Sequence, residues 1–398
     1  MARLLVLFVT AFVDMVGLAM IVPLLPYYAT EYGASALVVG LLISAFSIAQ
    51  LACAPAWGRV SDRYGRRPAI LAGLAITAAA YVLFAFANSV PLLLVARLVQ
   101  GMGGGTIGVV QAYVADASTP AERTKSLGWL TAVTSLGAVA GPALGSALDT
   151  LGGPRGVGLG AAALAALVGV FALRYLRESR ETAARPSGAH VPMTGRAAIR
   201  HVIANAGAPA PRLIWIYTIA IGAFYGTIQT SPLLLSDRLG ITEHTIGYFI
   251  MYLGALGVVV RTIVLGRMAD ALGEMPVARF GAVALAGGLA ITGLAHSLPM
   301  VMVGFTLMPI GTGLLFPCVT GMLSQAVRSS ERGLYMGVQH TFGGVSRVAF
   351  PIGAGFLMDR FGVGVPFWLS ALLVLATLPL ARSVADTPRE RTAPEVAR

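Results

Sequence analysis

The sequence predicts an all-α membrane protein with twelve transmembrane helices. Its composition, its long apolar runs and the placement of its basic residues lead to this prediction. Hydrophobic residues make up 57% of the 398 residues and charged residues only 11%, whereas a soluble domain has roughly 45–50% apolar and about 25% charged residues. A soluble protein of this length would therefore lack the charges to cover its surface, and a disordered chain would need low hydrophobicity. The runs are too long and unbroken for the alternating strands of a membrane β-barrel.

Each predicted span is an apolar run of about 20 residues, the length that an α-helix needs to cross a bilayer. The first run follows Arg3 as a signal peptide would. It is too long for one, it contains Asp14, and no small-residue cleavage site follows it, so we interpret it as a helix. The predicted spans are roughly 4–28, 36–57, 69–87, 91–114, 126–148, 155–176, 212–235, 244–266, 277–295, 299–321, 333–357 and 362–382.

The basic residues predict the orientation of the chain. All but six of the 28 Lys and Arg residues fall in segments on one side of the predicted membrane. Because Lys and Arg accumulate in cytoplasmic loops, both termini are predicted to be cytoplasmic, and the net charge of +11 reflects topology instead of a nucleic-acid partner. The six exceptions lie in opposite-side loops (Arg155, Arg238, Arg360) or within spans (Arg97, Arg261, Arg347).

The two halves of the chain are related repeats. The segment GRVSDRYGRRP at 58–68 matches GRMADALGEMP at 266–276, and Pro142 and Asp149 find counterparts in Pro351 and Asp359. This predicts two pseudo-symmetric six-helix bundles, which by their parallel repetition favour alternating access around a midplane site. The predicted domains are a bundle at 1–176, a cytoplasmic linker at 177–211 with a short surface helix around 196–204, a bundle at 212–382 and a cytoplasmic tail at 383–398.

Four segments carry a family resemblance that extends over the whole chain. The loop GRVSDRYGRRP resembles the signature loop of the major facilitator superfamily. DMVGLAMIVPLLP at 14–26, RLVQGMGGG at 97–105 and LGAVAGPALG at 136–145 are similar to motifs of its twelve-helix drug:proton antiporters. The second half departs from the pattern, with Glu274-Met275 in place of the basic pair and Phe350-Pro351 in place of Gly-Pro.

Three ionisable residues inside the spans are candidates for proton coupling. Asp14 is the only acid deep in a predicted helix, and such a residue is expensive in a bilayer and a functional candidate by default. Arg97 lies in the fourth span, and the resemblance implies that it assists proton transfer with the first-span acid. His340 shares a helix face with Arg347 and is a possible second proton site. For each, a structural charge or a hydrogen-bonded neutral side chain is the alternative.

The resemblance also implies gating and packing roles. Asp62 would cap a helix of the other half that begins near Gly333, and Arg66 would pair with Asp116, so that the cytoplasmic side closes in the outward-open state. Gly137, Gly141 and Gly145 recur one helical turn apart beside Pro142, and small residues at that spacing allow close helix contact. The gating residues are Gly58, Asp62, Gly65, Arg66 and Asp116, and the antiporter-motif residues are Gly137, Gly141, Pro142 and Gly145.

Polar and aromatic residues predict a substrate pocket, because aromatic walls suit flat apolar molecules. Packing and the aromatic belts at the membrane interfaces are the alternative reading. The candidate substrate-binding residues are Gln50, Gln100, Gln111, Tyr217, Phe224, Gln229, Tyr252, Phe316 and Gln339.

The sequence contains no nucleotide-binding loop, no catalytic constellation and no metal-ligand spacing. It predicts a non-enzyme without cofactor or metal, a monomer in the inner membrane of a bacterium, with protons, a small-molecule substrate and the lipid bilayer as its partners. The predicted function is export of small amphipathic molecules or drugs in exchange for protons. The alternatives are narrow efflux of a sugar, amino acid or other metabolite, and a non-transporting membrane sensor or scaffold.

Overall fold

The computed structural model describes residues 2–119, 122–176, 178, 195–328 and 331–380. Residues 177 and 179–194 of the predicted linker at 177–211, and all of the predicted tail at 383–398, lie outside the described residues. Within the described residues the regular secondary structure is entirely helical, as predicted.

Among the residues that the structure describes, the first half contains seven helical elements and the second half nine. Those of the first half are α1 (Ala2–Ile21), α2 (Leu25–Glu31), α3 (Ala36–Tyr64), α4 (Arg66–Ala85), α5 (Val90–Gly104), α6 (Ile107–Asp116) and α7 (Arg123–Tyr175). Those of the second half are α8 (Gly195–Ala204), α9 (Pro209–Leu239), α10 (Glu243–Val259), the π-helical segment η2 (Val260–Val264), α11 (Leu265–Leu272), α12 (Glu274–Leu294), α13 (Leu298–Ala326), α14 (Arg332–Phe361) and α15 (Val365–Leu375).

Nine helical stretches in the described residues are long and apolar enough to cross a membrane. The stretch that contains α7 holds two of the predicted spans, because its backbone leaves the helical conformation at Gly152 and at Gly153, which has a φ of +56°. With α14 and α15, whose ranges cover the last two predicted spans, the helices are consistent with twelve crossings. Large apolar side chains such as Leu151 and Leu167 are 83% and 67% exposed, as expected of helices that face lipid.

Two predicted spans are interrupted in the structure. The first is divided into α1 and α2 by a turn that contains Pro23, and proline cannot donate the backbone hydrogen bond that would continue a helix. The fourth is divided into α5 and α6 at Gly105 and Thr106, after the glycine run that begins at Gly103. The short surface helix predicted around 196–204 is α8, and it contacts α9 through a hydrogen bond from Trp215 Nε1 to the Val202 carbonyl.

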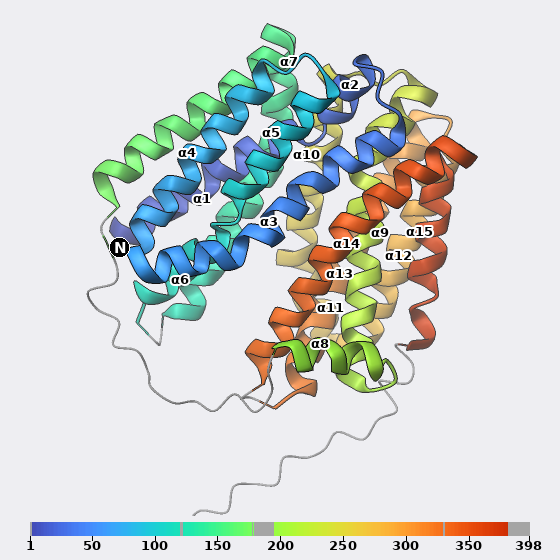
Figure 1. The fold of residues 1–398 in the computed structure, drawn as a ribbon. Coiled ribbons are helices and arrows are strands. Elements are labelled where there is room, and N and C mark those ends of the chain that lie inside the picture. The colour runs from blue at the N-terminus through green and yellow to red at the C-terminus, as the bar shows by residue number, and fades with distance from the viewer. Residues whose placement is uncertain (1, 120–121, 177, 179–194, 329–330, 381–398) are drawn as a thin grey trace, which may run out of the picture.

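The helices form two bundles, one from each half of the chain, which meet at one end and diverge toward the other (Figure 1). The two halves contact each other through α3 with α14 and through α7 with α10. We call the end where they meet, around residues 32–35 and 240–242, the closed side. The opposite end, which carries α8, is the linker side.

Candidate functional site

A cavity of about 550 Å³ lies inside the first-half bundle and contains the carboxyl group of Asp14. Its walls come from α1, α4, α6 and α7, and they are mainly apolar, with hydroxyl groups from Thr10, Thr106, Thr131 and Thr134. Gln111 also lines it, and it is the one predicted substrate residue of this cavity. The cavity therefore offers an ionisable carboxyl, several hydroxyls and an apolar surface to a molecule that enters it.

Arg97 is fully buried in α5 and has no carboxylate partner among the described residues. Its guanidinium donates to Gln100 Oε1 at 2.5 Å and to the Leu42 carbonyl at 3.5 Å. It also lies 4.9 Å from the centre of the Phe46 ring. Arg97 and Asp14 therefore do not form an ion pair, and Gln100 is held beside the arginine.

Tyr81 lies between these two groups, and sequence reasoning missed it. Its ring and hydroxyl pack against Gly17 on α1, where a Cβ would lie 2.9 Å from the Tyr81 oxygen. Asp14, Arg97 and Gln100 lie near this hydroxyl. Tyr81 is 1% exposed, and its hydroxyl has no hydrogen-bond partner among the described residues. No motif marks it in the sequence.

The loop at 58–68 is tied together within its own half. Arg66 donates from Nη1 to Asp62 Oδ1 at 3.1 Å and from Nε to Asp116 Oδ2 at 3.2 Å, so the expected pairing of Arg66 with Asp116 is present. Gly65 adopts a φ of +105°, and Glu178 accepts hydrogen bonds from the backbone N–H groups of Arg66 and Arg67 at the start of α4. Gly58 has open space where a Cβ would project.

The two expected gating contacts behave differently in this conformation. Asp62 pairs with Arg66 and does not reach the helix that begins near Gly333, because the two halves diverge on the linker side (Figure 1). The expected cap belongs to the conformation in which this side is closed, and it stays a prediction. The bond of Arg66 to Asp116 is present although this side is open, because both residues belong to the same half.

The glycines of the antiporter motif bring α7 against α1. A Cβ at Gly141 would lie 2.6 Å from Ala19 Cβ and 2.7 Å from the Val16 carbonyl oxygen. Gly137 approaches the Phe12 carbonyl and Gly145 the Met20 backbone in the same way. Any side chain at these positions would overlap a neighbouring backbone, so glycine is required along this seam.

In the corresponding seam of the second half, the glycines lie on the opposite helix. Gly222 and Gly226 are on α9, and the large side chain, Phe350, is on α14. Phe350 occupies the position that corresponds to Gly141, and its side chain fills the space beside Gly222 and Gly226 on α9. The Phe350 ring therefore fills this groove, and a smaller side chain there would leave part of it empty.

The other predicted substrate residues are distributed over both halves. The rings of Tyr217 and Phe316 lie 5.4 Å apart, and Phe224 contacts Tyr225 at 5.5 Å. Three members are held by hydrogen bonds: Gln50 to the Gly104 carbonyl, Tyr252 to Thr306 and Gln339 to Thr320. Gln229 is half-buried on α9 and His340 is exposed on α14.

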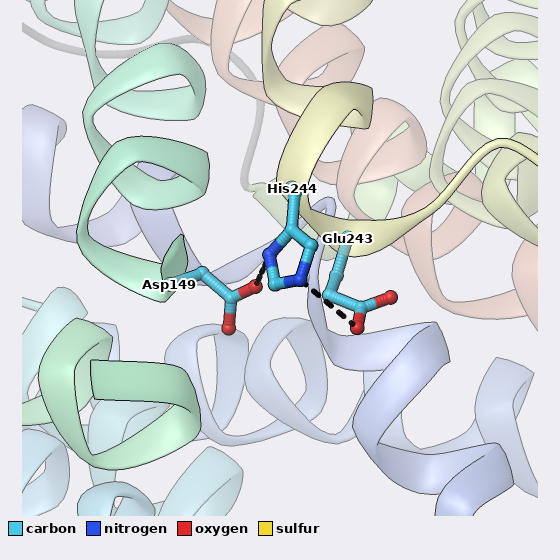
Figure 2. Close-up of side chains that lie close together, drawn as sticks. All are labelled: Asp149, Glu243 and His244. Atoms are coloured by element: carbon cyan, nitrogen blue, oxygen red, sulfur yellow. Dashed lines mark ion pairs between the residues drawn. The ribbon is translucent and has the colours of Figure 1, made fainter. Parts of the chain in front are cut away.

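On the closed side, Asp149 forms the centre of a contact between the halves that was not recognised from the sequence as functional. It is 3% exposed. Its Oδ1 accepts a hydrogen bond from the Tyr28 hydroxyl, and its Oδ2 lies 2.7 Å from His244 Nδ1 at the start of α10 (Figure 2). Ser146 adds a bond to the Glu243 carbonyl at 2.6 Å and accepts one from the Gly247 N–H.

Asp359 makes the corresponding contact between α14 and α3. Its two carboxylate oxygens accept hydrogen bonds of 2.9 Å from the N–H groups of Ala36 and Leu37. These N–H groups have no partner within their own helix, and the positive end of the helix dipole favours an anion there. The signal for both contacts was the repeat itself, which aligns Asp149 with Asp359.

The family model of the Major Facilitator Superfamily matches residues 7–292 and 230–398. The chain belongs to the Major Facilitator Superfamily. It is 25% identical to the class B tetracycline resistance protein of Escherichia coli, over 97% of this chain and 98% of that protein. It is 26% identical to multidrug resistance protein 1 of Bacillus subtilis, over 96% and 94% of the two chains.

Solved structures of other transporters share the fold. The human organic anion transporter MFSD10 has a TM-score of 0.69 at 24% identity, over 96% of this chain and 99% of that one. A bacterial homologue of the human lysosomal transporter Spinster, in an inward-facing unoccupied conformation, has a TM-score of 0.81 at 15% identity, over 96% and 97%. The chain is thus a multi-pass membrane transporter of this superfamily, with a small-molecule substrate.

One side-chain cluster of this transporter has the composition of a metal site, although the sequence predicts none. Ligand atoms of Asp149, Glu243 and His244 all lie within 4.8 Å of one another (Figure 2). One imidazole and two carboxylates are a ligand set that divalent zinc accepts. The ion pair of His244 with Asp149 already accounts for the closeness of these groups, so the contact between the halves is sufficient to explain the cluster.

Proposed function

We propose that this transporter exports small amphipathic molecules or drugs in exchange for protons. The observation that carries the proposal is that Asp14 lines the first-half cavity, near the buried Tyr81 and the hydrogen-bonded pair of Gln100 and Arg97. An acid at this depth is costly unless it serves the transport cycle. Relatives whose names refer to tetracycline and multidrug resistance support export, and the human relative is an organic anion transporter.

In this proposal Asp14 takes up a proton from one side of the membrane and releases it to the other. Tyr81 and Gln100 provide hydroxyl and amide groups in the region between Asp14 and Arg97. Because a proton gradient supplies the energy, no cofactor is required. His340 is proposed as a secondary site whose charge changes with pH.

The linker side is proposed to face the cytoplasm of a bacterium, with the protein as a monomer in the inner membrane. The distribution of Lys and Arg supports this orientation. The described conformation is then inward-facing, with the closed side toward the exterior. Substrate would enter from the cytoplasm or the inner leaflet, and Asp62 would reach the start of α14 only in the opposite conformation.

The test is transport by purified protein in proteoliposomes, with tetracycline and ethidium as separate probes and an imposed pH gradient. Asp14→Asn should abolish concentrative transport, and Tyr81→Phe should slow it while leaving the protein folded. Asp237→Asn, the same change at an exposed position near the end of α9, is the control and should transport normally. Concentrative transport by Asp14→Asn would refute the proposed role of Asp14.

The same assay separates the alternatives. Gradient-driven transport of a sugar or amino acid, with no transport of either drug, would support a narrow metabolite exporter. Absence of transport for every compound, together with ligand-induced conformational change, would support a sensor or scaffold.

A further inference from the structure

The central region of the second half carries positive charge and no carboxylate. The six predicted spans between residues 212 and 382 contain no Asp or Glu, but they include Arg261 and Arg347. Arg347 lies halfway along α14, and so near the middle of the membrane. Among the described residues, neither arginine forms an ion pair. An arginine at such a depth is expensive, and it usually faces a partner or a water-filled cavity.

Four elements bring these charges next to aromatic rings. The Arg347 guanidinium lies 5.9 Å from the centre of the Tyr225 ring on α9, and the charges of both Arg347 and Arg261 act on the Tyr217 hydroxyl. The Tyr217 ring in turn contacts Phe316 on α13. The Arg261 side chain passes Gly313, where a Cβ would lie 3.6 Å from Arg261 Cγ. The two arginines and the three rings thus lie in one region of the second half.

The backbone at Arg261 is unusual. Residues Val260–Val264 form a π-helical segment, and it is the one such segment among the described residues. A π-bulge is rare and occurs frequently at functional sites. It changes the direction in which the following helix turn projects its side chains, and here it coincides with one of the two arginines.

We propose that Arg261 and Arg347 bind the anionic head group, a carboxylate or sulfonate, of an amphipathic aromatic substrate whose ring packs against Tyr217 and Phe316. The guanidinium group forms two parallel hydrogen bonds with a carboxylate and recognises planar anions better than an ammonium does. An anion between the arginines would supply the counter-charge that the protein lacks. This inference rests on the proposed function and names its substrate class.

The experiment uses three probes with one ring system: 1-pyrenebutyrate, neutral 1-pyrenebutanol and the cationic pyrenebutyl-trimethylammonium. Binding to the full-length protein in nanodiscs is measured by pyrene fluorescence. Wild-type protein should bind the butyrate about tenfold more tightly than the alcohol, and the cation more weakly than either. Equal affinity for the anion and the cation, or no binding of the butyrate, would overturn the inference.

Variants assign the preference to the two arginines. Arg347→Gln and Arg261→Gln should each weaken butyrate binding about tenfold and change alcohol binding by less than about twofold. Arg261→Lys should fall between wild type and Arg261→Gln, because it keeps the charge and loses the planar fork. Arg267→Gln, an exposed arginine on α11, is the matched control. Equal loss of all three probes in the arginine variants would indicate a structural role only.

Two readouts keep this inference separate from the proposed function. If Arg347→Gln does not fold, the exposed Arg261 still provides the test through its Gln and Lys variants. Arginine-dependent binding of pyrenebutyrate without gradient-driven export would refute proton-coupled export and support the anion site. Asp14-dependent export of ethidium with no arginine-dependent anion preference would support export and refute the anion site.

Discussion

Two contacts join the halves on the closed side, α3 with α14 and α7 with α10. They share the same backbone arrangement, but their aspartates bind different partners. In each, the carbonyl of a repeat-related proline meets a glycine of the other half: Pro351 meets Gly40, and Pro142 meets Gly247. In each, an aspartate ends the contact. Asp149 is buried and bonded to the side chains of Tyr28 and His244, whereas Asp359 is exposed and caps the first turn of α3.

This difference shows which features of the contact must be the same in both repeats. The backbone approach of glycine to proline is present in both copies, because close packing leaves no room for variation there. The aspartates have diverged, because either a side-chain partner or a helix terminus can satisfy a carboxylate. On the linker side, by contrast, Asp62 is bonded within its own half.

The largest effect is expected from adding one methyl group to the glycine–proline contact. In Gly40→Ala the new Cβ would overlap the carbonyl of Pro351, and overpacking costs about 1–3 kcal/mol, enough to shift the population of the closed side up to about a hundredfold. Gly353→Ala on α14, the helix that contains Pro351, is the control, because open space surrounds that position.

The measurement is the distance between spin labels at Glu31 and Ser236, exposed positions near the closed side, in protein with Cys53 and Cys318 replaced. Gly40→Ala should populate longer distances than wild type. If Gly40→Ala and Gly353→Ala give the same distance distribution, the glycine–proline contact does not control closure.

Removal of the buried carboxylate should have the second-largest effect. Asp149→Ala leaves the Tyr28 hydroxyl and His244 without their partner, and a buried polar group without a hydrogen bond costs about 1–3 kcal/mol. We expect the population in which the closed side has opened to increase about tenfold, measured with the same labels. Asp149→Asn, which still accepts from Tyr28, should shift the population less; a larger shift in Asn than in Ala would contradict this account.

The exposed aspartate should contribute less. Asp359→Ala removes a helix cap from α3, which typically costs about 0.5–2 kcal/mol, and water can reach the N–H groups that it leaves. A few-fold shift is expected, and Asp359→Asn should recover part of it because an asparagine oxygen also caps. If Asp359→Ala opens the closed side more than Asp149→Ala, burial is not what distinguishes the two contacts.

The fold could be predicted from the sequence because its signals are long and redundant. Apolar runs, basic loops and a repeat of the 58–68 loop each indicate the same architecture, and the surface helix α8 was found near its predicted position. Helix breaks were less visible: Pro23 and the glycines around Gly105 lie inside runs that read as continuous. A run of apolar residues shows that a segment crosses the membrane but does not show where its backbone bends.

The candidate site was only partly accessible to the same reasoning. Asp14 and Arg97 are visible because charge is rare in an apolar span, whereas Tyr81 is one tyrosine among twelve and becomes notable only through its position near Gly17 and Gln100. Of the partners of Asp149, Tyr28 lies about 120 positions away in the same half and His244 comes from the other half, and no sequence spacing encodes their meeting. The packing of Phe350 against Gly222 and Gly226 could not be predicted from the sequence either, because it depends on how the two helices meet.

The smallest effect is expected from a change at His244. This change tests whether the second partner of Asp149 distinguishes its contact from that of Asp359. Its side chain is 48% exposed, and a solvent-accessible ion pair contributes about 0–1 kcal/mol. His244→Gln should therefore shift the population of the closed side by at most about fivefold, because Asp149 keeps its bond from Tyr28. The distance between the labels at Glu31 and Ser236 would be compared in wild type, His244→Gln and Asp149→Ala. A shift in His244→Gln as large as that in Asp149→Ala would mean that His244, and not Tyr28, holds the carboxylate in the contact.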